Sequence, residues 1–187
     1  MRTTAYICRA RRSDRDELRA VQQAAMRQLG PVCYEPEVIE AFIAQVGTMD
    51  EQLIEDGTYF VMLTRGMIVG CGGWSVRTAG DTASTASVSA SDLPPSATIR
   101  SVYVRPAWAR QGIARRVMAA VEADIMAHGY DRVVLSATLT SIPFYRQLGY
   151  RGGEPVVLQL QGGLPFVSLN MTKELARYGR LRLEAAA

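Results

Sequence analysis

The segment from Thr98 to His128 constrains the fold more than any other part of the chain. Its first run, Thr98–Val104, is rich in β-branched residues and stops before Pro106, which is typical of a strand. From Arg110 onward, apolar residues recur at helical spacing until His128-Gly129 ends the pattern. A strand that leads through a glycine turn into an amphipathic helix predicts an α/β chain.

The remaining segments add strands and helices around this unit. Besides Thr98–Val104, we expect strands at Tyr6–Cys8, Tyr59–Thr64, Met67–Trp74, Arg132–Ala137, Val156–Leu160 and Phe166–Met171. Besides the helix from Arg110, we expect one that ends at Gly30-Pro31, one from Pro36 to Gly47, and a short one with Pro143 in its first turn.

The chain length of 187 residues suggests one domain of ordinary size. We assign residues 1–174 to that domain and residues 175–187 to a C-terminal tail. Residues 75–97 are rich in Ser, Thr and Ala and close with Pro94-Pro95. We interpret them as a long exposed loop, because neither flanking part has enough elements to fold alone.

Composition excludes several function classes. A net charge of +3 does not demand a nucleic-acid partner, and no apolar run approaches the roughly 20 residues of a membrane span. His128 is the only histidine, and Cys8, Cys33 and Cys71 are scattered, so we expect no metal and no disulfide framework. Reduced thiols fit a cytoplasmic protein.

The turn before the predicted helix has features that are typical of a phosphate-binding site. Gly112 and Ala114 leave the backbone open to close approach, and Arg110 and Arg115 add positive charge. An ordinary turn is the alternative. The GxxxxGK[ST] and GxGxxG patterns are absent, so neither a nucleotide triphosphatase nor a dinucleotide enzyme is supported.

The segment from Arg105 to Arg116 resembles the acyl-CoA-binding motif of the GNAT N-acetyltransferase superfamily. In that motif (Arg/Gln)-x-x-Gly-x-(Gly/Ala) follows a strand and opens a helix. Gly112 and Ala114 match it, while Ala109 stands where the family carries Arg or Gln.

Two further segments resemble the same superfamily, so that the resemblance covers roughly residues 5–173. Ser136–Tyr150 is similar to its later strand and short helix, with Phe144-Tyr145 on the helix and Gly149-Tyr150 at its end. Tyr59–Trp74 is similar to its preceding hairpin.

This resemblance implies a fold and a co-substrate. The fold is a mixed, mostly antiparallel central sheet of six to seven strands, with splayed central strands and about four flanking helices. The co-substrate is acetyl-CoA. The positions that match the family's cofactor contacts are Val102, Tyr103, Val104, Arg110, Gln111, Gly112, Ile113, Ala114, Arg115, Thr138 and Thr140.

The resemblance also implies a reaction, in which an amine attacks the acetyl-CoA thioester directly in a ternary complex. Tyr145 matches the family's general acid, and a phenol with a pKa near 10 is protonated at neutral pH. A purely packing role is the alternative. The strand Thr98–Val104 carries no carboxylate, so the base stays unassigned among water, a backbone carbonyl, and Asp81, Asp92 or Glu35.

For the acceptor we expect an amine of a small molecule, although no motif names it. Trp74 is a candidate wall of its pocket or a core residue. Arg100 is a candidate partner of an acidic acceptor or a solvent-facing residue, and Tyr34 is a candidate lid residue.

Other functions stay open at this point. Ala109, Thr140 and the missing strand carboxylate are compatible with a CoA-binding or sensing module that has little transferase activity. A protein N-acetyltransferase is a further, less supported alternative. The assembly is open between a monomer and a homodimer.

Overall fold

The computed structural model describes residues 5–47, 50–76 and 96–175. Its strands are β1 (Tyr6–Arg9), β2 (Tyr59–Thr64), β3 (Met67–Val76), β4 (Ala97–Val104), β5 (Arg132–Thr138), β6 (Arg151–Gln159) and β7 (Pro165–Glu174). They form one sheet in the order β1-β2-β3-β4-β5-β7-β6. Only the pair β4 and β5 is parallel. The predicted mixed and mostly antiparallel sheet is therefore confirmed.

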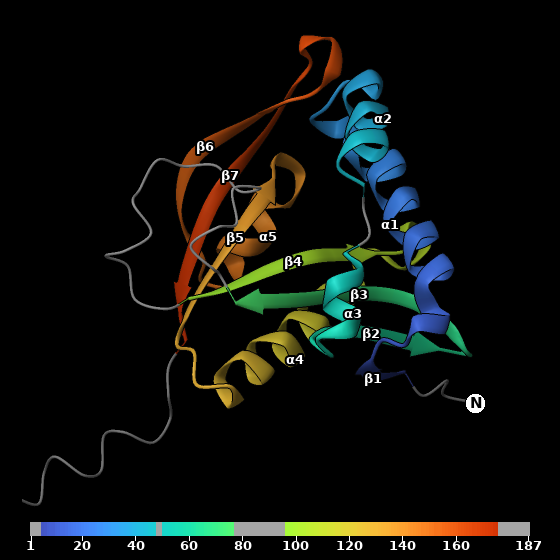
Figure 1. Ribbon diagram of the computed structural model, residues 1–187, viewed down its shortest axis with the longest axis vertical. Helices are drawn as coiled ribbons and strands as arrows, with labels where there is room; N and C mark the ends of the chain where they lie inside the picture. Colours follow the sequence, from blue (N-terminus) through green and yellow to red (C-terminus); the bar gives the residue numbers. More distant parts are fainter. Residues whose placement is uncertain (1–4, 48–49, 77–95, 176–187) are drawn as a thin grey trace, which may run out of the picture.

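Helices cover both faces of this sheet (Figure 1). They are α1 (Arg15–Leu29), α2 (Pro36–Gln45), α3 (Glu51–Glu55), α4 (Ile113–Ala127) and α5 (Ile142–Gln147). Helices α4 and α5 share one apolar core with the sheet, whereas α1, α2 and α3 contribute to two other cores. Among the described residues, none of the helices has the length and apolar character needed to cross a membrane.

Helix α4 packs very closely on β3 because β3 presents glycines there. A Cβ on Gly70 would lie 2.5 Å from Ile113 Cγ2, and a Cβ on Gly72 would lie 2.9 Å from Val117 Cγ1. Ile113 and Val117 are both buried on the apolar face of α4. The glycines of β3 therefore set how near the start of α4 lies to the sheet.

A partly buried ion pair ties α4 to the other half of the sheet. Nζ of Lys173, on β7, donates to Glu122 Oε2 of α4 at 2.6 Å. The hydroxyl of Tyr150 donates to the second carboxylate oxygen at 2.8 Å. The only lysine of the chain thus fixes Tyr150, which follows α5, against α4.

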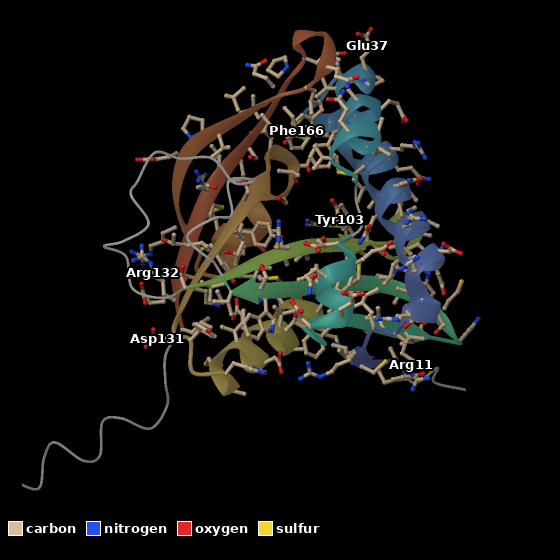
Figure 2. All side chains as sticks on the ribbon, viewed as in Figure 1. Arg11, Glu37, Tyr103, Asp131, Arg132 and Phe166 are labelled. Atoms are coloured by element: carbon tan, nitrogen blue, oxygen red, sulfur yellow. The ribbon has the colours of Figure 1, made fainter. Side chains whose placement is uncertain are left out.

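The tip of the β6–β7 hairpin reaches across to α2. Phe166 of β7 stacks on Phe42 of α2 with ring centroids 4.2 Å apart, and on Tyr34 at 4.7 Å. Figure 2 shows Phe166 on this side of the molecule and Tyr103 on β4 below it. These contacts hold the segment between α1 and α2 over the sheet.

The structure corrects several expected boundaries. The helix expected from Arg110 begins at Ile113, because Arg110 and Gly112 have φ of 64° and 78°, which a right-handed helix cannot continue. Strand β3 extends through Val76, and β6 begins five residues earlier than expected, at Arg151. The five-residue helix α3 was not expected, since it is too short for a periodic pattern.

Two predicted segments fall largely outside the described residues. Of the loop assigned to 75–97, residues 77–95 are not described. Of the tail assigned to 175–187, residues 176–187 are not described.

We predict that Gly70→Ala lowers the free energy of unfolding by about 1–3 kcal/mol, the usual cost of overpacking a core. The added methyl group would meet Ile113 at the first turn of α4. Urea unfolding is the measurement. Met67→Ala, at a partly exposed position of the same strand, is the matched control and should change stability by less than about 0.5 kcal/mol. Equal stability of the two variants would contradict the close packing.

Candidate functional site

The central feature of the sheet is a gap between β4 and β5. The two strands pair only where residues 97–99 lie opposite residues 133–135. Beyond that point β4 stays paired with β3, and β5 stays paired with β7. Each strand is therefore held by its outer neighbour while their inner edges diverge. The free inner edge of β4 carries backbone groups that a ligand can pair with.

A β-bulge bends β4 where the gap begins. Ser101 and Val102 together lie opposite a single residue of β3, Gly72. Ser101 has a φ of 55°, an uncommon conformation for a residue with a side chain. A bulge of this kind increases the local bend and twist of its strand. It turns the second half of β4 away from β5.

A cavity of about 180 Å³ lies at this gap. Its walls come from the last turns of α1, residues 99–104 of β4, the end of β5 with the residues that follow it, and Tyr145 of α5. Because α1 and α5 pack against different cores of the sheet, the cavity reaches from one face of the sheet to the other.

Tyr145 brings a phenol hydroxyl, a potential proton donor, to the cavity. Its ring packs against Phe144 and lies edge-on to Tyr150, with centroids 5.1 and 5.6 Å away. Within the described residues, no hydrogen-bond partner of its hydroxyl is found, although Tyr145 lines the cavity. Burial raises the pKa of Tyr145 well above its ordinary value. The hydroxyl is therefore protonated at neutral pH and free to donate.

The turn before α4 presents a row of free backbone donors. In the described part of the chain, the N–H groups of residues 110–115 donate to no acceptor, and the first helical bond runs from Arg116 to Gly112. Arg110 and Gly112 take left-handed conformations within this row. Arg110 and Arg115 are exposed beside it, and no acidic residue occurs between Arg100 and Val121. Such a concave row of N–H groups at a helix start binds anions, phosphates above all.

Comparison with known proteins shows which family this arrangement belongs to. The sequence profile of the acetyltransferase (GNAT) family matches residues 18–150, more than half of the chain. The chain belongs to the acetyltransferase (GNAT) family. Comparison with curated proteins gives no significant match.

Solved GNAT structures share the fold at low sequence identity. A GCN5-related N-acetyltransferase from Rhodopseudomonas palustris has a TM-score of 0.70 and 18% identity, covering 94% of this chain and 99% of its own. The PaiA N-acetyltransferase of Thermoplasma acidophilum, solved with coenzyme A, has a TM-score of 0.65 and 14% identity, covering 91% and 99%. A GNAT family acetyltransferase from Brucella melitensis, solved with acetyl-CoA, has a TM-score of 0.57 and 19% identity, covering 94% and 90%.

The residues expected to hold the co-substrate fall into two groups in this GNAT chain, five at the cavity and six at the turn before α4. Val102, Tyr103 and Val104 line the cavity on the free edge of β4, and Thr138 and Thr140 line it from the end of β5. The residues of the turn, 110–115, lie at the start of α4, beyond the end of β4.

Tyr34 lies at the cavity but is fixed rather than lid-like. Its hydroxyl donates to the carbonyl of Val167 at 2.7 Å and accepts from the backbone N–H of Leu139 at 2.8 Å. Burial, the largest effect, raises the pKa of Tyr34 above its ordinary value. Tyr34 therefore ties the α1–α2 segment to the ends of β5 and β7.

Arg100 also lines the cavity, and it has a partner. Its guanidinium lies 3.2 Å from Asp50 Oδ2 in an ion pair that is only partly exposed. A side chain simply pointing to solvent is therefore not what the structure shows. Asp50 was not singled out from the sequence, because only the fold brings it to β4.

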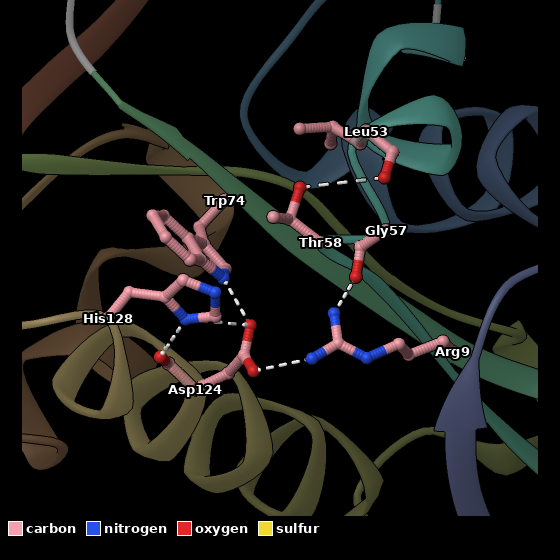
Figure 3. Close-up of polar contacts among 7 residues, drawn as sticks. All are labelled: Arg9, Leu53, Gly57, Thr58, Trp74, Asp124 and His128. Atoms are coloured by element: carbon pink, nitrogen blue, oxygen red, sulfur yellow. Dashed lines mark hydrogen bonds and ion pairs between the residues drawn. The ribbon is translucent and has the colours of Figure 1, made fainter.

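Trp74 does not reach the cavity. It is 2% exposed in the core beneath α4, where its indole N–H donates to Asp124 Oδ2 at 2.8 Å (Figure 3). Arg9 binds the other oxygen of Asp124 at 2.8 Å, and the ring of Trp74 meets His128 edge-on at 5.1 Å. We therefore correct its expected role as a pocket wall, because this side of β3 faces α4.

The described residues offer no carboxylate in the cavity wall. Glu35 lines a second cavity of about 480 Å³ on the other side of Tyr34, and Asp81 and Asp92 lie outside the described residues. No group of three or more His, Cys, Asp or Glu side chains in the described ranges could hold a metal ion.

Sequence reasoning missed several hydroxyl residues of the cavity. Ser136 lies within hydrogen-bond distance of Ser168 at 2.8 Å, and Ser141 donates to the carbonyl of Thr138 at 2.8 Å. The hydroxyl-rich run from Ser136 to Ser141 was a signal for this group. Ser101 gave no signal, because a bulge has no sequence pattern of its own.

We predict that Tyr34→Phe lowers the free energy of unfolding by about 1–3 kcal/mol, because it leaves the N–H of Leu139 without its acceptor. Denaturant unfolding is the measurement. Tyr6→Phe is the control, since Tyr6 is 53% exposed and should change stability by less than about 0.5 kcal/mol. A Tyr34→Phe protein as stable as the control would show that this hydroxyl does not fasten the α1–α2 segment.

Proposed function

We propose that this protein transfers an acetyl group from acetyl-CoA to an amine of a small molecule by direct attack in a ternary complex. The observation that carries the proposal is the unpartnered hydroxyl of Tyr145 in a cavity that opens along a free strand edge. The family and the CoA-bound neighbours support acetyl-CoA as the co-substrate.

The free donors of the turn fit a pyrophosphate group. The N–H groups of residues 110–115 would donate to its oxygens, with Arg110 and Arg115 adding positive charge. Space is available there, since a Cβ on Gly112 would meet no atom within 4 Å. The free edge of β4 at residues 102–104 would pair with the amide groups of a pantetheine arm, as a neighbouring strand does.

Acetyl-CoA supplies the acetyl group as a thioester. A backbone N–H on the free edge of β4 polarises the thioester carbonyl by donating to its oxygen. The amine nitrogen then bonds to the carbonyl carbon, and the carbon–sulfur bond breaks. Tyr145 gives its proton to the departing sulfur and regains one from the acceptor's nitrogen through solvent.

The acceptor must arrive as a neutral amine. With no carboxylate in the described cavity wall, we assign removal of the amine proton to water. Arg100, held by Asp50, is suited to bind an acidic group of the acceptor at the cavity wall. We propose that the acceptor is a small molecule whose amine reaches the cavity beside Tyr145.

The proposal has a direct test in two steps. Saturating acetyl-CoA, at about 100 times its dissociation constant, should stabilise the protein by roughly 2.7 kcal/mol, or about 5–10 °C in thermal unfolding. A panel of small amines is then screened for release of free CoA. Binding without release from any amine, peptide substrates included, would support the alternative of a CoA-binding module, which Ala109 and the missing carboxylate favour.

We predict that Gly112→Asp weakens acetyl-CoA binding roughly tenfold or more, because it places a negative charge beside the anion-binding turn. Gly112→Asn is the matched control. Asparagine has the same shape and tolerates the left-handed backbone that this position requires, so it should bind nearly as well as the parent. Calorimetric titration is the measurement, and equal affinities of the two variants would place the phosphates elsewhere.

We predict that Tyr145→Phe lowers kcat about 100-fold with little change in KM for acetyl-CoA, as expected for loss of a general acid. Because the pKa of Tyr145 is raised, its hydroxyl stays protonated up to at least pH 10, near the ordinary pKa of a phenol. The parent's kcat should therefore rise with pH as the amine loses its proton, with no fall before about pH 10. A fall near pH 8 that Tyr145→Phe abolishes would contradict this role.

A further inference from the structure

A buried polar cluster lies behind the bulge of β4. Gln22 of α1 is 0% exposed, and its amide nitrogen donates to the hydroxyl of Tyr59 on β2. The Tyr59 hydroxyl in turn lies 3.5 Å from the carbonyl oxygen of Ser101, and Sγ of Cys71, on β3, lies 3.6 Å from the same oxygen. Side chains from β2 and β3 thus converge on one carbonyl of the bulge, and α1 contacts one of them.

Both groups that face this carbonyl are donors at neutral pH. Burial, the largest effect, raises the pKa of Cys71 to about 11 and the pKa of Tyr59 well above its ordinary value. The thiol and the phenol therefore keep their protons. The carbonyl of Ser101 is the acceptor that they share.

Stability alone does not explain this cluster. The side-chain oxygen of Gln22 is buried and has no hydrogen-bond partner, which is an unfavourable arrangement. A leucine at position 22 would fill a similar volume among the apolar neighbours Leu18 and Val21 without that penalty. The cluster is therefore costly to keep unless it does something for the bulge.

The direction of one N–H group follows from the cluster. The peptide between Ser101 and Val102 is trans and planar, so its C=O and its N–H point in opposite directions. Since the Ser101 carbonyl points toward Tyr59 and Cys71, on β2 and β3, the N–H of Val102 points away from those strands. At this level β4 has no pairing with β5, and Val102 lines the cavity.

We propose that Gln22, Tyr59 and Cys71 are positioning residues that aim the N–H of Val102 at the thioester carbonyl. The proposal rests on the proposed acetyl transfer and assigns the polarising donor to one residue. None of the three side chains touches the substrate. Each acts through the Ser101–Val102 peptide, whose left-handed Ser101 would otherwise have several arrangements open to it.

The test replaces the amide by an apolar side chain of similar size, Gln22→Leu. The direct readout is the infrared carbonyl band of bound [1-¹³C]acetyl-CoA, which moves to lower frequency when a donor polarises the carbonyl. We expect the shift seen with the parent protein to fall by half or more in Gln22→Leu. We also expect kcat to fall about tenfold, less than the loss of a donor itself would cause, with KM for acetyl-CoA unchanged. Thermal stability should stay equal or rise.

Two further variants make the outcome decisive. Tyr59→Phe should reduce the carbonyl shift to the same extent, and the double variant should add little, because the two side chains act in one chain of contacts. Thr64→Val, which removes a buried hydroxyl elsewhere on β2, is the matched control and should keep the parent's shift and kcat.

The outcomes separate this proposal from the proposed function. If the parent protein neither binds acetyl-CoA nor releases CoA, the proposed function fails. If the parent binds it with a shifted carbonyl band and both Gln22→Leu and Tyr59→Phe keep that band and the parent's kcat, only the positioning role is overturned. A fall in kcat with an unmoved band would overturn it as well, since the effect would then not pass through the carbonyl.

Discussion

The short pairing of β4 with β5 is the constraint on which the rest of the site depends. These strands share three residue pairs and then separate, while β3 and β7 hold their outer edges. Had the pairing continued, the inner edge of β4 would be saturated and the cavity closed. The bulge at Ser101 lies where the strands diverge, and Tyr145 lines the space that results. The short pairing thus accounts for both the free edge of β4 and the cavity beside it.

Much of the fold could be predicted from the sequence, because its elements have local signals. Thr98–Val104 and Arg132–Ala137 lie within observed strands, and the glycine at 112 marks the start of α4. The predicted boundaries of helices and strands were wrong where the backbone departs from a regular pattern. Arg110 has a positive φ that no propensity indicates, and α3 has only five residues.

The residues of the candidate site likewise divide into those that have a local sequence signal and those that do not. Residues carried by motifs, such as Gly112 and Tyr145, can be found from spacing, and the structure places Gly112 at the start of α4 and Tyr145 at the cavity. Residues whose surroundings depend on which face of a strand is covered cannot be found from spacing. Trp74 faces α4 rather than the cavity, and Asp50 meets Arg100 only through long-range folding. The cluster of Gln22, Tyr59 and Cys71 joins three elements that are far apart in sequence, so no local sequence pattern predicts it.

The central claim is that the gap beside β4 and the turn before α4 together hold acetyl-CoA. Amide hydrogen exchange with and without acetyl-CoA tests it most directly, because the N–H groups of residues 110–115 have no acceptor in the described chain and should exchange fast when unbound. The account predicts strong added protection at residues 102–104 and 110–115. Binding that left both segments unprotected, or that protected a different surface, would contradict it.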